Sequence, residues 1–158
     1  MPKTPIHRFL LTATLLAAAP PLLAQERAES AKSASVAVEE FMRAAADSNL
    51  TRMAQLFGTD KGSAARAGTV KDYAQRMVVA QGVLSGSVVK AIAETQMGKK
   101  DHTLVTTEIA KGGCKVTVPV TAVKSKEGWL VREFDLSAVW DGINRPCEAT
   151  GRTGNTGG

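Results

Sequence analysis

The chain has 158 residues with a formal net charge of +5 at pH 7, and 44% of them are hydrophobic. This length suits one domain with a single core and argues against a multidomain architecture. The basic residues are scattered along the chain without a long run or interleaved aromatic side chains, which argues against a nucleic-acid-binding surface.

The N-terminal segment has the layout of a secretory signal peptide. A basic start with Lys3 and Arg8 precedes an apolar run over 9–19, and a small residue, Ala24, precedes a polar stretch. The run is shorter than the about 20 residues that a membrane-spanning helix needs. We therefore expect cleavage between Ala24 and Gln25, and a periplasmic or secreted protein with no stable membrane anchor. A retained, uncleaved signal is the alternative.

Cleavage at this bond would leave 158 − 24 = 134 residues and a net charge of 5 − 2 = +3, because two basic residues are lost. Within the mature chain we expect a polar linker or helix start over 25–34 and one folded domain over 35–148. The tail over 149–158 is rich in glycine and polar residues, so it is expected to be disordered.

Two short helices are predicted at the start of this domain. The first is capped by Ser35, and the second begins at Asn49 and stops at Gly58, in the left-handed conformation that glycine adopts readily. Both carry apolar side chains at helical spacing on one face. These side chains are Val38, Phe41, Met42 and Ala45 in the first helix and Leu50, Met53, Ala54 and Phe57 in the second.

A loop and a third helix are predicted next. Residues 58–68 contain three glycines and no apolar side chain larger than alanine, which is typical of a loop. The helix is expected over 69–84. It begins with a reduced capping box formed by Thr69 and Asp72, and Gly82 and the Ser-Gly-Ser segment of 85–87 end it. Its predicted buried side consists of Val70, Tyr73, Ala74, Met77 and Val78.

From Val88 onward apolar residues recur at every second position, which is the period of a β-strand. The segments 88–95, 102–110, 114–123 and 128–136 are rich in β-branched residues, and short connections containing glycine separate them. This pattern predicts four antiparallel strands in hairpin succession, with one face toward the helices. The residues of the third strand predicted on one face are Cys114, Val116, Val118, Val120 and Ala122. Pro119 cannot donate to a ladder, so it indicates an edge or a bulge.

The chain contains two cysteines, Cys114 and Cys147. In an exported protein such a pair is expected to form a disulfide, which would stabilise the fold by about 3 to 4 kcal/mol. The bridge would hold the segment between Leu136 and Cys147 on the fold, with Val139 and Trp140 packed against the rest of the domain. The alternative is a buried Cys114 and a free thiol at Cys147.

The order of two helices, a glycine-rich loop, a helix and an antiparallel meander, with FMRAAADSNLTRMAQLF at the front, resembles the nuclear transport factor 2-like (NTF2-like) superfamily over residues 34–136. The resemblance implies an α+β fold with three N-terminal helices packed against a curved antiparallel sheet of about four long strands. It also implies a cone-shaped pocket between helices and sheet. This superfamily contains enzymes, ligand binders and interaction modules, so function does not follow from the fold.

Binding in such a pocket is the preferred function, with a small apolar ligand or a side chain of an exported partner protein as occupant. The candidate lining residues are Tyr73, Met77, Trp129, Phe134 and Trp140. In the alternative interpretation these side chains fill the core. A further alternative is a module that binds a partner, or forms a homodimer, through its sheet face. No cofactor and no metal site are expected.

An enzyme resembling ketosteroid isomerase, or another enzyme that uses this pocket, is the remaining alternative. Proton transfer would need a carboxylate base and hydroxyl donors that hold an oxyanion. Tyr73 is the only tyrosine, and His102 lies beside a predicted turn. The carboxylates of the strand region, Glu94, Glu108, Glu133 and Asp135, form no recognisable motif with Tyr73. We therefore assign no catalytic residue.

Overall fold

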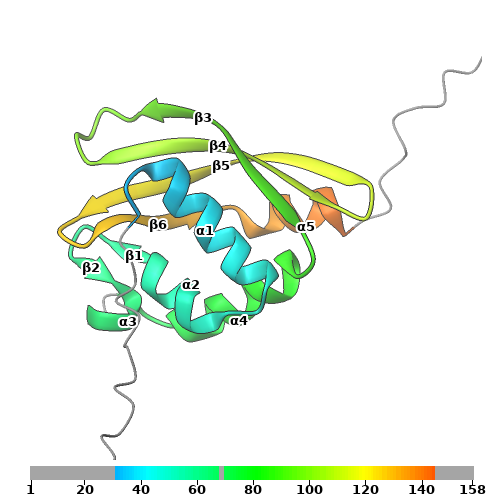
Figure 1. The fold of residues 1–158 in the computed structure, drawn as a ribbon, viewed down its shortest axis with the longest axis horizontal. Helices are drawn as coiled ribbons and strands as arrows, with labels where there is room; N and C mark the ends of the chain where they lie inside the picture. The colour runs from blue at the N-terminus through cyan, green and yellow to red at the C-terminus, as the bar shows by residue number, and fades with distance from the viewer. Residues whose placement is uncertain (1–30, 68–69, 145–158) are drawn as a thin grey trace, which may run out of the picture.

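The computed structural model describes residues 31–67 and 70–144. Its elements are α1 (Ala34–Ala46), α2 (Leu50–Leu56), β1 (Gly58–Thr59), β2 (Gly62–Ser63), α3 (Ala64–Ala67), α4 (Tyr73–Leu84), β3 (Val88–Gln96), β4 (His102–Lys111), β5 (Cys114–Ser125), β6 (Gly128–Phe134) and α5 (Leu136–Ile143). The last four strands form an antiparallel sheet in the order β3-β4-β5-β6. The sheet curves over α1, with α2 and α4 beneath (Figure 1). The predicted α+β class and four-stranded meander are therefore confirmed.

Helix α1 is the centre of the core. Its predicted buried side chains, Val38, Phe41, Met42 and Ala45, are all fully buried. The predicted cap at Ser35 is wrong, because the Ser33 hydroxyl accepts the hydrogen bond from Val36 N at 3.2 Å. The backbone N–H of Ser35 donates instead to Glu94 Oε1 on β3, at 2.8 Å. A residue distant in the sequence thus satisfies one of the free amides that every helix N-terminus presents.

Helix α2 begins as predicted, with Asn49 Oδ1 accepting from Arg52 N at 2.9 Å. Its predicted end at Gly58 is wrong, because Phe57 is the C-cap with an extended backbone and Gly58 begins β1. Glycine is still required there, since a Cβ atom at Gly58 would lie 2.3 Å from the carbonyl oxygen of Gly62. Leu50 is 40% exposed and does not share the buried face.

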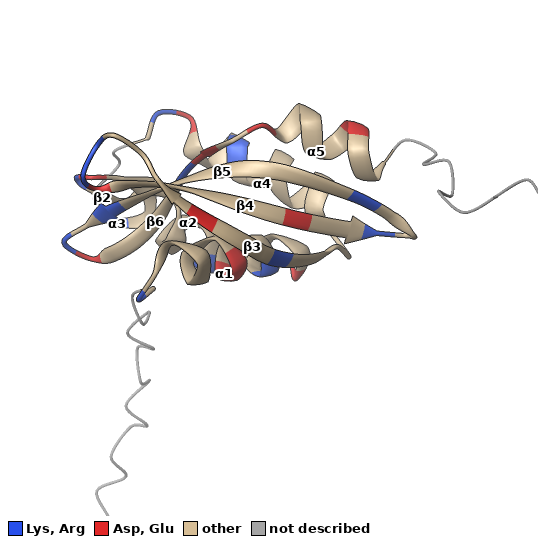
Figure 2. Ribbon diagram, turned by 90° about the horizontal axis from the view of Figure 1, so that it is seen from above, with Lys and Arg blue, Asp and Glu red and all other residues tan. Residues whose placement is uncertain are grey.

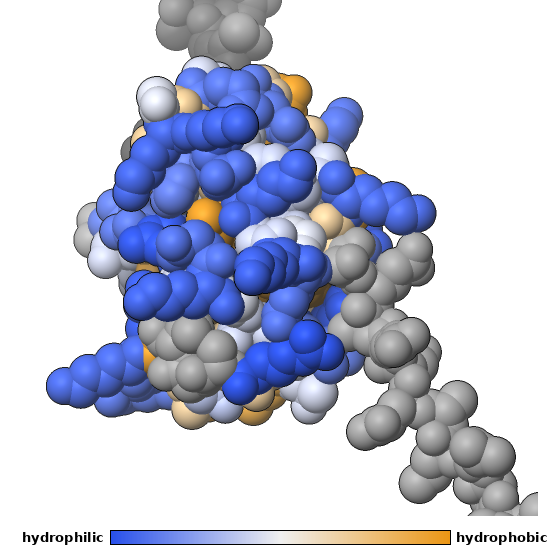
Figure 3. Space-filling model, turned by 90° about the vertical axis from the view of Figure 1, so that its left-hand side faces the viewer, coloured by the Kyte–Doolittle hydropathy of each residue, from blue (hydrophilic) through white to orange (hydrophobic). Residues whose placement is uncertain are grey.

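The segment predicted as a loop, 58–68, contains the β1–β2 hairpin and the short helix α3. Glu127, in the turn between β5 and β6, holds this segment by accepting from Ser63 N at 3.2 Å and from Arg66 Nη1 at 2.9 Å. Burial alone would raise the pKa of Glu127, but the hydrogen bonds from Ser63 and Arg66 and the charge of Arg66 lower it below its ordinary value. Hydrophilic side chains predominate among the described residues at this end of the molecule (Figure 3).

Helix α4 buries a different face from the predicted one. Met77 is buried as expected, but Ala74 and Val78 are exposed. The buried residues of the helix are Met77, Ala80, Val83 and Leu84. Asp72 is the N-cap but adopts a left-handed backbone and makes no capping hydrogen bond through its side chain, while Thr69 lies outside the described residues. The helix ends at Leu84, directly before the Ser-Gly-Ser segment of 85–87 that was predicted to end it.

The sheet follows the predicted alternation closely. In β4 the residues Thr103, Val105, Thr107 and Ile109 are buried, and their neighbours along the strand are half-buried. Strand β5 lies inside the sheet, so Pro119 is not on an edge strand. The pairing of β5 with β6 covers Val120–Ser125 and therefore stops one residue short of Pro119. A register shift between Thr121 and Ala122 makes this pairing irregular, as the proline indicated. Charged residues of both signs are dispersed along the sheet rather than gathered in one patch (Figure 2).

The segment after β6 forms helix α5. Asp135 caps it by accepting from Ser137 N at 2.9 Å and from Ala138 N at 3.0 Å. Val139 is fully buried, as expected for a segment held on the fold, whereas Trp140, which was also predicted to pack on the fold, is 49% exposed. Gly142 lies so close to β5 that a Cβ atom there would be 2.4 Å from Val116 Cβ.

Several predicted features lie outside the described residues. These are the signal peptide with its cleavage bond at Ala24 and Gln25, the tail, and Cys147. Cys114 is buried at the start of β5, but the predicted disulfide also requires Cys147 and therefore stays a prediction. In the part of the chain that is described, no helix has both the length and the apolar character needed to cross a membrane.

Candidate functional site

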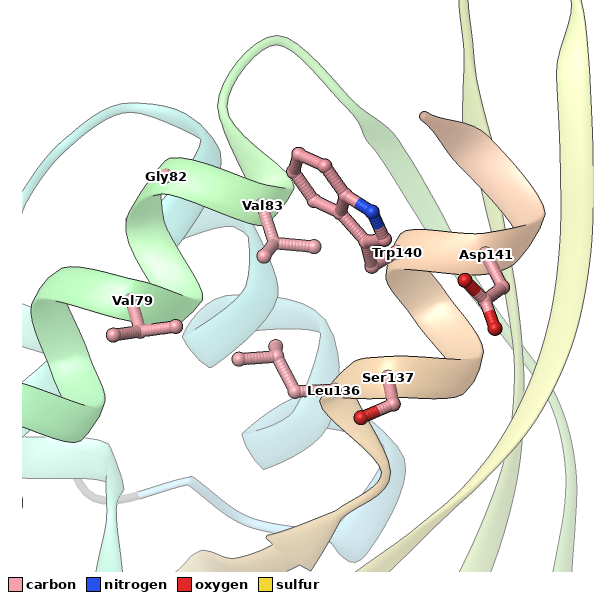
Figure 4. A pocket seen from close by; sticks show the side chains of 7 residues that line it. All are labelled: Val79, Gly82, Val83, Leu136, Ser137, Trp140 and Asp141. Atoms are coloured by element: carbon pink, nitrogen blue, oxygen red, sulfur yellow. The ribbon is translucent and has the colours of Figure 1, made fainter. Parts of the chain in front are cut away.

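An apolar groove of about 570 Å³ lies between α4 and α5 (Figure 4). Helix α4 contributes one wall and the start of α5 the other. The lining residues are Val79, Gly82, Val83, Leu136, Ser137, Trp140 and Asp141. In the close-up view, Val79, Val83 and Leu136 point into the space between the two helices, and the Trp140 indole extends toward α4. The walls are therefore mainly aliphatic and aromatic.

A second depression, of about 250 Å³, continues this surface along α4. Val79 and Leu136 line both depressions, so we treat the two as one site and call it the α4–α5 groove. The residues that line only the second depression are Phe57, Gln75, Arg76, Met77, Ala80 and Phe134.

The groove exposes apolar side chains that a small domain usually buries. Val79 and Trp140 are each 49% exposed. Contiguous apolar surface of this kind on a small protein commonly marks a binding site. The space under the sheet is occupied instead by core side chains, because Phe41 of α1 packs against Phe57 and Phe134 with ring centroids 5.8 Å apart in each pair.

Arg76 supplies the positive charge of the groove. Its guanidinium carbon lies 5.3 Å from the centroid of the Phe57 ring, a cation–π contact that holds the side chain over the second depression. It forms no ion pair with any described residue. Phe57 itself is buried, so the ring that supports Arg76 is fixed by the core.

The five predicted lining residues are distributed as follows. Met77 and Phe134 line the second depression, and Trp140 lines the first. Trp129 lies elsewhere, where its backbone N–H donates to the Ala31 carbonyl at 3.1 Å, and Tyr73 packs against the core at the start of α4. The first depression therefore lies between two helices, whereas the second also has walls from Phe57 and from Phe134 at the end of β6.

Sequence reasoning missed Arg76, Val79, Val83 and Leu136. The adjacent valines at 78 and 79 were a weak indication that this helix has a second apolar face, because two apolar residues in succession cannot both lie on one narrow helix face. The formation of α5 was not predicted, so nothing indicated a second wall opposite α4.

The carboxylates considered for catalysis mostly have structural partners. Asp135 caps α5, Glu94 accepts from the first turn of α1, and Glu108 Oε1 lies 3.1 Å from Lys115 Nζ. His102, at the start of β4, has a buried Nδ1 with no hydrogen-bond partner in the described part of the chain. Among residues 31–67 and 70–144, no three His, Cys, Asp or Glu side chains are grouped so that they could hold a metal ion.

Comparisons with known proteins give similarity to solved structures only. No protein-family model matches the sequence, and no curated protein is significantly similar to it. An NTF2-like protein of unknown function from Cytophaga hutchinsonii has 12% identity and a TM-score of 0.39, over 66% of this chain and 91% of that one. An LEH-like epoxide hydrolase from M. tuberculosis has 18% identity and a TM-score of 0.34, over 71% and 90%.

These similarities are too low to transfer an activity. The fold assignment rests on the chain's own topology, in which N-terminal helices pack on a four-stranded antiparallel meander. This order of elements agrees with the one that the sequence resemblance implied.

Proposed function

We propose that the mature protein is an exported, non-enzymatic domain that binds a small apolar ligand in the α4–α5 groove. The layout of the N-terminal segment supports export. The open groove with aliphatic and aromatic walls supports binding, because pockets for small molecules are mainly apolar with a few polar groups.

The observation that carries this proposal is the exposure of Val79 and Trp140 on facing helices. Removing apolar surface from water contributes about 25 cal/mol per Å² to the free energy of binding. A ligand that lies between these two side chains, on Leu136, would remove all three from water at once. Because α4 and α5 are already separated, the ligand would not have to open the fold.

The test uses the neutral apolar fluorophore N-phenylnaphthylamine, whose emission rises when it leaves water. We expect saturable binding to the mature protein, and loss of binding in Val79→Lys, which places a charge on the groove wall. Val78→Lys is the matched control, because Val78 is 55% exposed on the same helix but does not line the groove. Equal loss in both variants, or no saturable binding at all, would contradict the proposal.

Export and the disulfide are tested on protein purified from its native compartment. Intact mass should correspond to a chain that begins at Gln25 and lacks two hydrogens, as expected for a Cys114–Cys147 bridge. A mass that includes residue 1 would refute cleavage. Alkylation of both thiols in the unfolded, unreduced protein would refute the bridge.

Assembly through the sheet is a second candidate, because the edge strand β3 exposes Val88 and Ile92. Exposed edge strands of this kind can pair with a second copy. Sedimentation of the wild type and of a Val88→Lys, Ile92→Lys double variant would decide it. A concentration-dependent dimer that the double variant abolishes would support assembly, and a monomer at every concentration would exclude a homodimer.

A further inference from the structure

The α4–α5 groove has different chemistry at its two ends. Arg76 lies at one end of the second depression, and Trp140 lies in the first depression on the far side of Val79 and Leu136. The helical rise places Arg76 and Val83 about 10 Å apart along α4. That length suits a medium-chain alkyl group, and Val79 and Leu136, which line both depressions, are apolar.

Arg76 is prepared to bind an anion. It has no ion-pair partner in the described residues, even though Asp72 lies one turn earlier on the same helix. Its stacking on the buried Phe57 ring restricts the side chain before any ligand arrives, which lowers the entropy lost on pairing. A guanidinium presents a planar array of donors that matches a carboxylate.

The far end of the groove offers no partner for an anion. Its lining residues include no basic side chain, and Val83 and Trp140 make it mainly apolar. The groove therefore favours one orientation, with the anionic group at Arg76 and the apolar chain directed toward Trp140.

We infer that the ligand is an anionic amphiphile of the fatty-acid type, with its carboxylate paired to Arg76 and its alkyl chain lying along Val79 and Leu136. This inference rests on the proposed function and specifies the ligand class for the same site.

The experiment compares decanoate with decanol, two molecules with the same alkyl chain, by displacement of N-phenylnaphthylamine at neutral pH. Wild-type protein should bind decanoate more tightly than decanol. Arg76→Gln should weaken decanoate binding by about threefold to tenfold, the range expected for a partly exposed ion pair, and leave decanol binding unchanged. Arg76→Lys should keep more of the preference than Arg76→Gln, because it retains the charge. Arg43→Gln, an exposed α1 position that does not line the groove, is the control and should change neither affinity.

The outcomes separate the two proposals. If decanol binds as tightly as decanoate, the groove binds apolar ligands but the anionic preference is refuted. If Arg76→Gln weakens both ligands equally, Arg76 acts through its packing on Phe57, and the ion pair is refuted. If the fluorophore binds saturably but neither molecule displaces it, the fatty-acid ligand is refuted, while the proposed binding of an apolar ligand still depends on the Val79→Lys test.

Discussion

Substitution of Gly142 by alanine should destabilise the protein, although alanine normally favours a helix. Gly142 lies in α5, and a Cβ atom there would be 2.4 Å from Val116 Cβ and 2.6 Å from Val116 Cγ2. Real side chains do not approach this closely, so α5 must move away from β5. Overpacking of this kind costs about 1 to 3 kcal/mol, whereas the gain in helix propensity is about 1 kcal/mol.

Gly82 provides the matched control. It lies in α4, and a Cβ atom there would meet no atom within 4 Å. Gly82→Ala should therefore keep the propensity gain and stabilise the protein by up to about 1 kcal/mol. Because the propensity gain is common to both variants, their difference in the free energy of unfolding measures the overlap with Val116, and it should be about 1 to 3 kcal/mol.

The assay is urea unfolding of both variants, followed by far-UV circular dichroism and by tryptophan emission. A shift of α5 should also change the emission of the folded Gly142→Ala variant, because Trp140 lies on that helix. If Gly142→Ala proves as stable as Gly82→Ala, α5 does not pack against β5 as described, and the groove wall that it forms would be wrong as well.

Three further outcomes are expected. Ser33→Ala should lower the free energy of unfolding by about 1 kcal/mol because it removes a helix cap, whereas Ser35→Ala should have little effect; equal losses would show that the cap is misassigned. The lowered pKa of Glu127 means that its hydrogen bonds stabilise the fold above the ordinary pKa of 4.5 and that this contribution is lost as pH falls through the lower folded-state value. Urea midpoints between neutral and acidic pH should therefore fall less in Glu127→Gln than in wild type, and parallel curves would contradict this. Cys147→Ser should lower stability by about 2 to 4 kcal/mol by removing the predicted bridge to Cys114, as measured by urea unfolding beside reduced wild type; an unchanged midpoint would argue against the bridge.

Local patterns in the sequence were sufficient for the sheet and for the first two helices. Alternation of β-branched and polar residues predicted all four long strands, because successive side chains on a strand face opposite sides. The helical spacing of Val38, Phe41 and Met42 predicted the buried face of α1. Asn49 was identified as a cap because its side chain bonds an amide only three residues away.

Features that depend on residues distant in the sequence were missed. Ser33 and Ser35 are equivalent as local candidates for the cap of α1. Ser33 is the cap in the folded protein, where the backbone N–H of Ser35 donates to Glu94 of β3. Helix α4 has apolar residues on more than one side, so its contacts decide that Ala80 is buried and Val78 exposed.

The candidate site was predictable only in part, for the same reason. Met77, Phe134 and Trp140 were chosen as apolar or aromatic residues, and all three line the groove. The groove itself exists because α5 folds back beside α4, which requires the close approach of Gly142 to Val116. The sequence by itself determined which segments form strands and helices, since those preferences act between near neighbours. Only the tertiary structure decided which helix faces remain uncovered, because that depends on contacts between elements far apart along the chain.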